Sequence, residues 1–275
     1  MIKLVLTDID NTLIPLGAGK ATDHALEGIH ALLDVGVAFG PATGRDLDGM
    51  ARFFRGDEAC WRTGLISNGK LIYLDGNLVK ATYFDHDQVR AMCEVVRAND
   101  DALAVLRADE VDYAFGGTRE QVNAAADVLG ENLPDIDGVP DGNILTVTLM
   151  CEGDPARCEE VADQARAAAS GLEFLSPVAH VYDVVPRGWN KATALAELMG
   201  AMGVLPEEVV VFGDSQNDIP ILRMVPNSVA VANAMPEAAE VARHHIGACA
   251  DDAVADALFQ IAEATARGEL PDFLL

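Results

Sequence analysis

The chain has 275 residues, and 50% of them are hydrophobic, so it can bury one large core or two smaller ones. It carries 19 Lys and Arg residues against 44 Asp and Glu residues, a formal net charge of −25. Since no local run of basic residues offsets this charge, it repels polyanions, and we expect no nucleic-acid partner.

The first residues contain one lysine and a short apolar run that Asp8 and Asp10 interrupt, which is unlike a signal peptide. No uncharged apolar run approaches the ~18 residues that a membrane span needs. The five cysteines form no CxxC pair, which favours reduced, buried thiols over a disulfide framework or a zinc site. We therefore expect a soluble cytoplasmic protein without a membrane partner.

The chain begins with the pattern of a strand, a helix and a second strand. Residues 2–7 are a short apolar run rich in branched side chains, which is typical of a buried strand. Apolar residues then recur at helical spacing from Leu26 to Val35 and stop at Gly36, which can end a helix. A second strand is predicted over 37–42. This order favours a parallel sheet covered by helices.

The middle of the chain follows a different pattern. Helices are predicted near residues 87–98, 119–129 and 155–169, and strands near 103–107, 111–115, 144–150 and 180–185. Because strands and helices are mixed here rather than strictly alternating, this segment is predicted to be an α+β insertion.

Strand and helix alternate again toward the end of the chain. Helices are predicted at residues 190–203, 216–224 and 252–266, and strands at 209–212 and 228–231. We therefore predict an α/β fold with a doubly wound, Rossmann-like parallel-sheet core made of residues 1–81 and 187–275, and an inserted α+β domain at 82–186.

Polar residues follow the predicted core strands at their carboxyl ends, where doubly wound sheets bind ligands. They are Asp8 and Asp10 after the first strand, Thr43, Gly44 and Arg45 after the second, and Asp214, Asn217 and Asp218 after the strand at 209–212. Lys191 opens the helix before that last strand. Carboxylates gathered at one edge repel each other by ~1 to 4 kcal/mol per pair at ~4 Å. A divalent cation relieves this repulsion, and oxygen ligands without His or Cys favour Mg²⁺.

These residue types suit phosphoryl transfer. A carboxylate can attack phosphorus to form an acyl phosphate, which divides one difficult step into two. A second carboxyl group, that of Asp10, can protonate the leaving oxygen and then activate water. Lys191, Thr43 and the backbone N–H groups of 9–12 can supply positive potential. Taken singly, each residue could instead be a cap, a turn residue or a solvated side chain, and it is their joint occurrence at strand ends that predicts the site.

Four motifs carry a resemblance to a known family. They are residues 8–13 (DIDNTL), 42–45 (ATGR), 187–191 (RGWNK) and 213–218 (GDSQND), with further similarity at 67–69 and 231–237. On these motifs the chain resembles the haloacid dehalogenase-like hydrolase superfamily, in particular its Cof-like phosphatases with a large inserted cap of the class IIB type. The resemblance reaches across the chain apart from the insertion, and it is specific for the superfamily rather than for a substrate.

The resemblance implies a role for each motif residue. Asp8 is the phosphorylated nucleophile, and Asp10 is the general acid and base. The implied Mg²⁺ ligands are Asp8, the backbone carbonyl of Asp10, and Asp214, with Asp218 close behind. The implied phosphate-binding residues are Thr43, Gly44, Lys191 and Asn217.

Three positions depart from the family pattern. Asn11 stands where Gly is common, but Asn tolerates the left-handed conformation. Ala192 follows the motif lysine where Gly is usual. Lys70 replaces a small residue, and we expect it to face water, the alternative being a positive charge near a substrate. His244 and His245 lie on a short segment far from the motifs and are expected to be structural.

The resemblance also implies hydrolysis of a small phosphorylated metabolite, a sugar phosphate or a similar phosphomonoester, beneath a cap that contacts the leaving group. Candidate cap contacts are Arg107, Tyr113, Arg119, His180 and Tyr182. Two alternatives stay open: a phosphomutase, which returns phosphate to another hydroxyl, and a non-catalytic protein that binds metal and phosphate. The motifs define neither the physiological substrate nor the oligomeric state.

Overall fold

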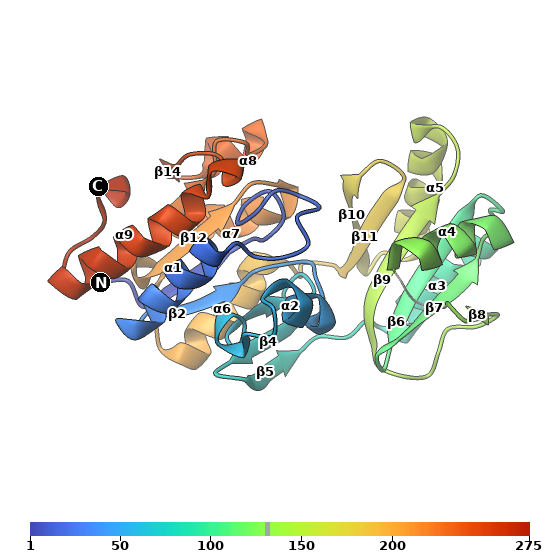
Figure 1. Ribbon diagram of the computed structural model, residues 1–275. Coiled ribbons are helices and arrows are strands. Elements are labelled where there is room, and N and C mark those ends of the chain that lie inside the picture. Colours follow the sequence, from blue (N-terminus) through green and yellow to red (C-terminus); the bar gives the residue numbers. More distant parts are fainter. Residues whose placement is uncertain (130–132) are drawn as a thin grey trace. The chain divides into compact units, whose positions relative to one another are not determined.

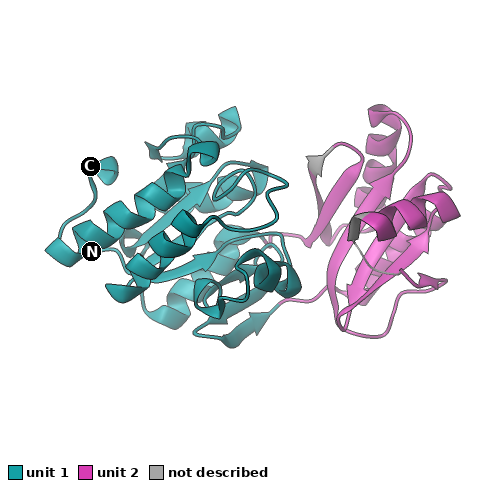
Figure 2. Cartoon of the chain, in the orientation of Figure 1, with its two compact units in different colours: residues 1–81, 190–275 teal, residues 82–189 magenta. Residues whose placement is uncertain are grey.

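The computed structural model describes residues 1–129 and 133–275, and the chain forms two compact units (Figure 2). Unit 1 consists of Met1–Ala81 and Asn190–Leu275, and unit 2 of Thr82–Trp189. The second junction falls at 189/190 rather than at the expected 186/187, because the intervening residues are hydrogen-bonded within unit 2. The Arg187 N–H donates to Gly171 O at 2.8 Å, and the Trp189 N–H donates to Pro186 O at 2.9 Å.

Unit 1 is built on a five-stranded parallel sheet with the order β14-β13-β12-β1-β2. Its strands are β1 (Leu4–Thr7), β2 (Ala38–Pro41), β12 (Val209–Gly213), β13 (Asn227–Ala230) and β14 (His244–His245). Every residue of β1 and β12 is buried, which explains why both are continuous apolar runs in the sequence. The predicted α/β fold with a parallel-sheet core is confirmed.

Helices cover both faces of this sheet (Figure 1). On one face, α1 (Asp23–Asp34) packs beside α9 (Ala253–Arg267), and on the other α6 (Lys191–Met202) packs beside α7 (Ile219–Met224). Gly28 permits the close approach of α1 and α9, because a Cβ there would lie 3.1 Å from the Ala255 carbonyl oxygen. A further short helix, α8 (Pro236–Val241), precedes β14. None of the helices among the described residues is both long and apolar enough to cross a lipid bilayer.

The segment from β2 to Ala81, where the chain leaves unit 1, contains elements that the sequence pattern did not predict. They are α2 (Leu47–Phe53) and a three-stranded antiparallel sheet of β3 (Gly64–Ile66), β4 (Leu71–Leu74) and β5 (Asn77–Ala81). The turn from β3 to β4 holds Ser67, Asn68 and Gly69 at φ values of 52°, 57° and 78°. The Thr43 N–H donates to Leu65 O at 2.8 Å, so this small sheet adjoins the carboxyl end of β2.

Unit 2 is a six-stranded sheet with the order β10-β11-β9-β6-β7-β8, in which β7 and β8 are parallel and the other neighbours antiparallel. The strands are β6 (Ala102–Ala108), β7 (Val111–Gly116), β8 (Asp135–Ile136), β9 (Ile144–Cys151), β10 (Leu172–Val178) and β11 (Val181–Pro186). The helices are α3 (His86–Arg97), α4 (Arg119–Leu129) and α5 (Pro155–Ala168).

Alternation along β6 gives unit 2 two apolar cores. Ala104 and Leu106 face the core that contains residues of α3 and α5, whereas Leu103 and Val105 face the core that contains Ala125 of α4. Because successive strand residues point to opposite faces, one strand can contribute to both cores. Helices on both faces of a mixed sheet agree with the predicted α+β character of the insertion.

Candidate active site

Three buried aspartates meet at the carboxyl edge of the parallel sheet. Asp8 and Asp214 directly follow the neighbouring strands β1 and β12, and the Asp8 N–H donates to Phe212 O at 3.0 Å. Asp218 comes from the turn after β12. One carboxylate oxygen from each lies within 4.8 Å of the others, and the three residues are 6%, 5% and 1% exposed. We call Asp8, Asp214 and Asp218 the acidic cluster.

Lys191 bridges two members of the acidic cluster from the start of α6. Its Nζ lies 2.8 Å from Asp8 Oδ1 and 2.6 Å from Asp218 Oδ1, and the residue is 1% exposed. The helix begins at Lys191 because Asn190 caps it, accepting the Ala192 N–H at 2.9 Å. Burial alone would lower the pKa of Lys191, but Asp218 and Asp8 raise it above its ordinary value, so the ammonium stays charged.

The turn after β12 is held by the carboxylate of Asp218. Its Oδ2 accepts the backbone N–H groups of Asp214 at 3.1 Å and Ser215 at 3.0 Å, while its Oδ1 faces Lys191. A Cβ on Gly213 would lie 2.7 Å from the Asp218 Cβ, so the close turn requires glycine. Asp218 therefore positions both the turn and the lysine.

The acidic cluster carries more negative charge than Lys191 can balance. Burial raises the pKa of Asp8 to about 7, although Lys191 opposes this shift. Burial also raises the pKa of Asp214 to about 6, although Thr12 Oγ1 donates to Asp214 Oδ1 at 2.7 Å. When all three carboxylates are ionised, the one ammonium leaves two negative charges uncompensated. A buried set of carboxylate oxygens with this deficit fits a hard divalent cation such as Mg²⁺.

The loop after Asp8 turns back on itself at Asn11. The N–H groups of Leu13 and Ile14 both donate to Ile9 O at 3.0 Å, and Asn11 has a left-handed φ of 61°. Asn11 Oδ1 accepts the Leu16 N–H at 3.0 Å, which stabilises the conformation that glycine would adopt more freely. The replacement of glycine by Asn11 is thus accommodated by a local hydrogen bond.

Asp10 is not part of the acidic cluster and forms a bidentate ion pair with Arg45. Arg45 Nε lies 2.9 Å from Asp10 Oδ2, and Nη2 lies 2.6 Å from Asp10 Oδ1. The Arg45 guanidinium also lies 5.0 Å from the Phe53 ring centroid, so two contacts fix its plane. Arg45 belongs to a strand-end motif, but its partner Asp10 is 35 residues away in the sequence, so the pairing is visible only in the fold.

Thr43, Gly44 and Asn217 are joined through Asn68. The Asn68 N–H donates to Thr43 O at 2.8 Å, and a Cβ on Gly44 would lie 3.4 Å from the Asn68 side chain. Asn217 Nδ2 donates to Asn68 Oδ1 at 3.2 Å. The Ala42 N–H donates to Thr7 O at 2.8 Å, which holds this group beside the strand that ends at Asp8. Asn68 thus connects the two segments, a role that its position in the sequence does not reveal.

Two further expectations have different outcomes. The expectation that Lys70 faces water is wrong, because the residue is 3% exposed. Lys70 lies between the left-handed turn at residues 67–69 and the buried start of β4, so its side chain is enclosed by the fold, where an ammonium requires polar partners. His244 and His245 form β14 at the end of the parallel sheet, as expected of a structural edge segment.

The candidates from the insertion have separate environments within unit 2. Tyr182 is buried and its hydroxyl donates to Glu159 at 3.0 Å. His180 Nδ1 lies 3.2 Å from Cys158 Sγ. Tyr113 packs against the core that holds α3 and α5, and Arg107 pairs with Asp112 at 3.1 Å.

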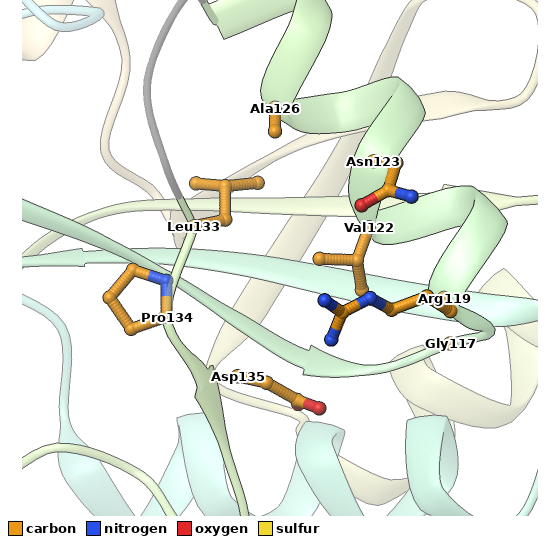
Figure 3. Close-up of a pocket in the computed structure, with 8 residues that line it drawn as sticks. All are labelled: Gly117, Arg119, Val122, Asn123, Ala126, Leu133, Pro134 and Asp135. Carbon is orange, nitrogen blue, oxygen red and sulfur yellow. The ribbon is translucent and has the colours of Figure 1, made fainter.

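Arg119 lies at a cavity of about 280 Å³ in unit 2. Figure 3 shows its guanidinium pointing from α4 toward Leu133 and Pro134, with Asn123 and Asp135 as further polar residues of the lining. Arg119 thus faces a cavity within its own unit.

Comparison with known proteins identifies the family. A sequence model of the haloacid dehalogenase-like hydrolase family matches residues 5–258. The chain is 28% identical over 274 residues to the HMP-PP phosphatase of Cronobacter sakazakii, covering 93% of this chain and 94% of that protein. A solved structure from Eubacterium rectale superposes with a TM-score of 0.83 at 25% identity, covering 94% of this chain and 98% of the other. A sugar phosphatase of subclass IIB superposes with a TM-score of 0.78 at 19% identity, covering 93% and 97%.

The parallel-sheet fold and the family match thus define a hydrolase of the α/β type. The chain belongs to the haloacid dehalogenase-like hydrolases and is a phosphatase of the Cof-like type, which confirms the predicted family and enzyme class.

Without divalent cations, the Asp8→Asn variant should be more stable than the wild type at pH 7.5 by a few kcal/mol, each pKa unit corresponding to ~1.4 kcal/mol. The folded pKa of Asp8 is about 7 against an ordinary 3.8. Between these values the folded state binds a proton that the unfolded state has lost, so stability falls as the pH rises. Urea denaturation in EDTA from pH 4 to pH 8 measures the difference, which should shrink toward pH 4.

The matched control is Asp23→Asn, whose carboxylate is 82% exposed and pairs with Arg55 at the surface. It should change stability by less than ~1 kcal/mol, without this pH dependence. Parallel profiles for Asp8→Asn and the wild type would show that burial does not destabilise the Asp8 carboxylate.

Proposed function

We propose that this phosphatase is Mg²⁺-dependent and hydrolyses small phosphomonoesters, sugar phosphates or similar metabolites, through a phosphorylated Asp8. The proposal rests on the different environments of the two carboxylate oxygens of Asp8. Asp8 Oδ1 is held by Lys191, whereas Oδ2 accepts no hydrogen bond from the residues that the structure describes. One oxygen is thereby fixed and the other keeps its lone pairs for attack on phosphorus.

The phosphoryl group would bind where Lys191, Thr43, Gly44 and Asn217 meet the end of β1. Lys191 supplies a charged donor that its ion pairs keep protonated. Asn217 is oriented by its hydrogen bond to Asn68. These groups would stabilise the charge on the equatorial oxygens, and the rest of an acidic protein would otherwise repel a phosphate ester.

The reaction would proceed in two displacements. Asp8 Oδ2 attacks phosphorus, the bond from phosphorus to the ester oxygen breaks, and Asp10 gives its proton to the leaving alcohol. Asp10 then takes a proton from water, whose oxygen attacks the acyl phosphate, and this releases inorganic phosphate and restores the Asp8 carboxylate. Asp10 would enter the first step protonated, with one of its oxygens still held by Arg45, and the bidentate pair with Arg45 would form again once that proton has left.

The metal proposal rests on the charge deficit of the acidic cluster. Asp8, Asp214 and the backbone carbonyl of Asp10 would hold Mg²⁺, with Asp218 as a further ligand or as the residue that positions the others. When bound, the cation supplies the positive charge that the cluster lacks and stabilises the charge of the transferred group.

The insertion is proposed to be the cap domain, and its residues to contact the leaving group. The similarity to a subclass IIB sugar phosphatase extends over 93% of this chain, the insertion included, and supports both the cap and a sugar phosphate as substrate. The five cysteines are free and buried, which supports the expected placement in a reducing compartment such as the cytoplasm.

Substitution of the two loop aspartates tests the proposed roles. Asp8→Asn should abolish release of phosphate from p-nitrophenyl phosphate and from sugar phosphates, because an amide cannot attack phosphorus. Asp10→Asn should lower kcat by ~10²- to 10⁴-fold, because it removes the proton donor. Asp23→Asn is the surface control. Near-normal turnover by either site variant would refute the role assigned to it, and an isomeric sugar phosphate in place of inorganic phosphate would indicate a mutase.

Removal of metal should stop turnover. After dialysis against EDTA, activity should fall to background, because the phosphate ester then meets the uncompensated charge of the acidic cluster. Added Mg²⁺ should restore it, and the Asp214→Asn variant should need a higher Mg²⁺ concentration for half-maximal rate. Full activity in EDTA would contradict the metal assignment.

Loss of the Arg45 guanidinium should slow catalysis without weakening substrate binding in proportion. Arg45→Met leaves Asp10 without its bidentate partner, so we expect kcat to fall by roughly 10- to 100-fold with a smaller change in KM. Arg45→Lys should not restore the rate, because an ammonium cannot make the paired contacts. Arg55→Met, which removes an exposed arginine of a surface ion pair, is the control. Normal kcat for Arg45→Met would show that Asp10 needs no such partner.

A further inference from the structure

A second group of potential metal ligands lies in unit 1, made of His30, Asp57 and Cys60. One nitrogen, one oxygen and one sulfur from these residues all lie within 4.8 Å of one another. His30 Nε2 is 2.7 Å from Asp57 Oδ2. His30 comes from α1, Cys60 ends the 3₁₀ turn Glu58–Cys60, and Asp57 caps that turn. None of the three belongs to the motifs that define the enzyme family.

The local fold fixes the two ligands on the turn. Asp57 Oδ1 accepts the Ala59 N–H at 3.3 Å and thereby caps the turn, while the Cys60 N–H donates to Asp57 O at 3.1 Å. The first oxygen of Asp57 is thus used by the backbone, and the second is turned toward His30. The Cys60 side chain is fully buried, whereas the His30 side chain is 48% exposed. The group therefore opens to solvent on its imidazole side.

The donor types differ from those of the acidic cluster. A thiolate, an imidazole and a carboxylate suit borderline and softer divalent ions such as Zn²⁺ and Co²⁺, whereas Mg²⁺ prefers oxygen alone. Tetrahedral zinc places its ligand atoms roughly 3.3 to 3.8 Å apart, given metal–ligand distances of ~2.0 to 2.3 Å. The three ligand atoms lie within 4.8 Å of one another, so the widest pair must close by at most roughly 1.5 Å. His30 Nε2 and Asp57 Oδ2, at 2.7 Å, must instead move apart by about 0.6 Å as their hydrogen bond gives way to the ion. The exposed His30 side chain can make that movement by changing its rotamer.

We propose that His30, Asp57 and Cys60 bind a thiophilic divalent ion, Zn²⁺ or Co²⁺, with water at the position that faces solvent. Binding converts the Cys60 thiol to a metal-bound thiolate and releases its proton to solvent, with no change in oxidation state. The ion would link α1 to the turn, so it would stabilise unit 1 independently of Mg²⁺ at the acidic cluster.

Titration of the metal-free protein with Co²⁺ tests the proposal, because a cobalt–thiolate bond gives a near-ultraviolet charge-transfer band that carboxylates do not give. The wild type should develop this band with one equivalent of Co²⁺ bound through sulfur. Cys60→Ser should lose it, and His30→Gln, a change at a half-exposed side chain that should not disturb folding, should weaken binding at least about tenfold. Zn²⁺ should displace Co²⁺ and abolish the band.

The control is Cys249→Ser, since Cys249 is the thiol whose pKa is influenced by Asp214 of the acidic cluster. This variant should keep the full band, and Cys60→Ser should keep its Mg²⁺-supported phosphatase activity. Absence of the band in the wild type would overturn the proposal. Its survival in Cys60→Ser, or an unchanged Co²⁺ affinity in His30→Gln, would do the same.

Discussion

The charge balance between three buried carboxylates and one buried ammonium governs the acidic edge of unit 1. Asp8, Asp214 and Asp218 lose most of their hydration, and Lys191 compensates only part of the cost. The part of the desolvation cost that Lys191 does not compensate raises the pKa of Asp8 and of Asp214. A site that is unfavourable when empty gains more from a divalent cation and a phosphoryl group than a neutral site would. The buried carboxylates lower the free energy of unfolding, and binding of a cation and a phosphoryl group at the same place raises it again.

The topology of the core brings these charged residues together from distant parts of the sequence. The sheet order places β1 beside β12, so that Asp8 and Asp214 extend from neighbouring strands. The chain leaves unit 1 after Ala81 and re-enters it at Asn190, and Lys191 is the next residue. The ion pairs of Lys191 therefore also fix the point at which the chain returns from the insertion.

Much of the fold could be predicted because its signals are local. The buried strands β1 and β12 are apolar runs, and the motif residues stand directly at their ends. The small sheet of residues 64–81 was not predicted, because its strands are three to five residues long and its first turn depends on three consecutive left-handed residues. Strand β10 was also missed, since the proline at 177 argues against a strand in a single sequence.

Some residues of the candidate site could likewise be predicted from local sequence signals, and others could not. Asp8, Asp10, Thr43 and Asp214 could be named as candidates from their strand-end positions, and Lys191 from its place at a helix start, whereas partners that meet only through tertiary packing could not. The Asp10–Arg45 pair spans 35 residues and the Asn68–Asn217 bond spans 149, so no spacing rule connects them. The burial of Lys70 and the His30, Asp57 and Cys60 group have the same origin. Residue type predicts what chemistry is possible, and the fold decides which residues meet.

Trapping the phosphorylated enzyme tests the account most directly. A ³²P-labelled phosphomonoester is mixed with the Mg²⁺-loaded enzyme, the reaction is quenched in acid within the first turnover, and the label is mapped by peptide mass spectrometry. The account predicts one phosphoryl group on the peptide that contains Asp8, formed before free phosphate and absent in Asp8→Asn. Label on another residue, or release of phosphate in the first turnover with no labelled peptide at any time, would contradict it.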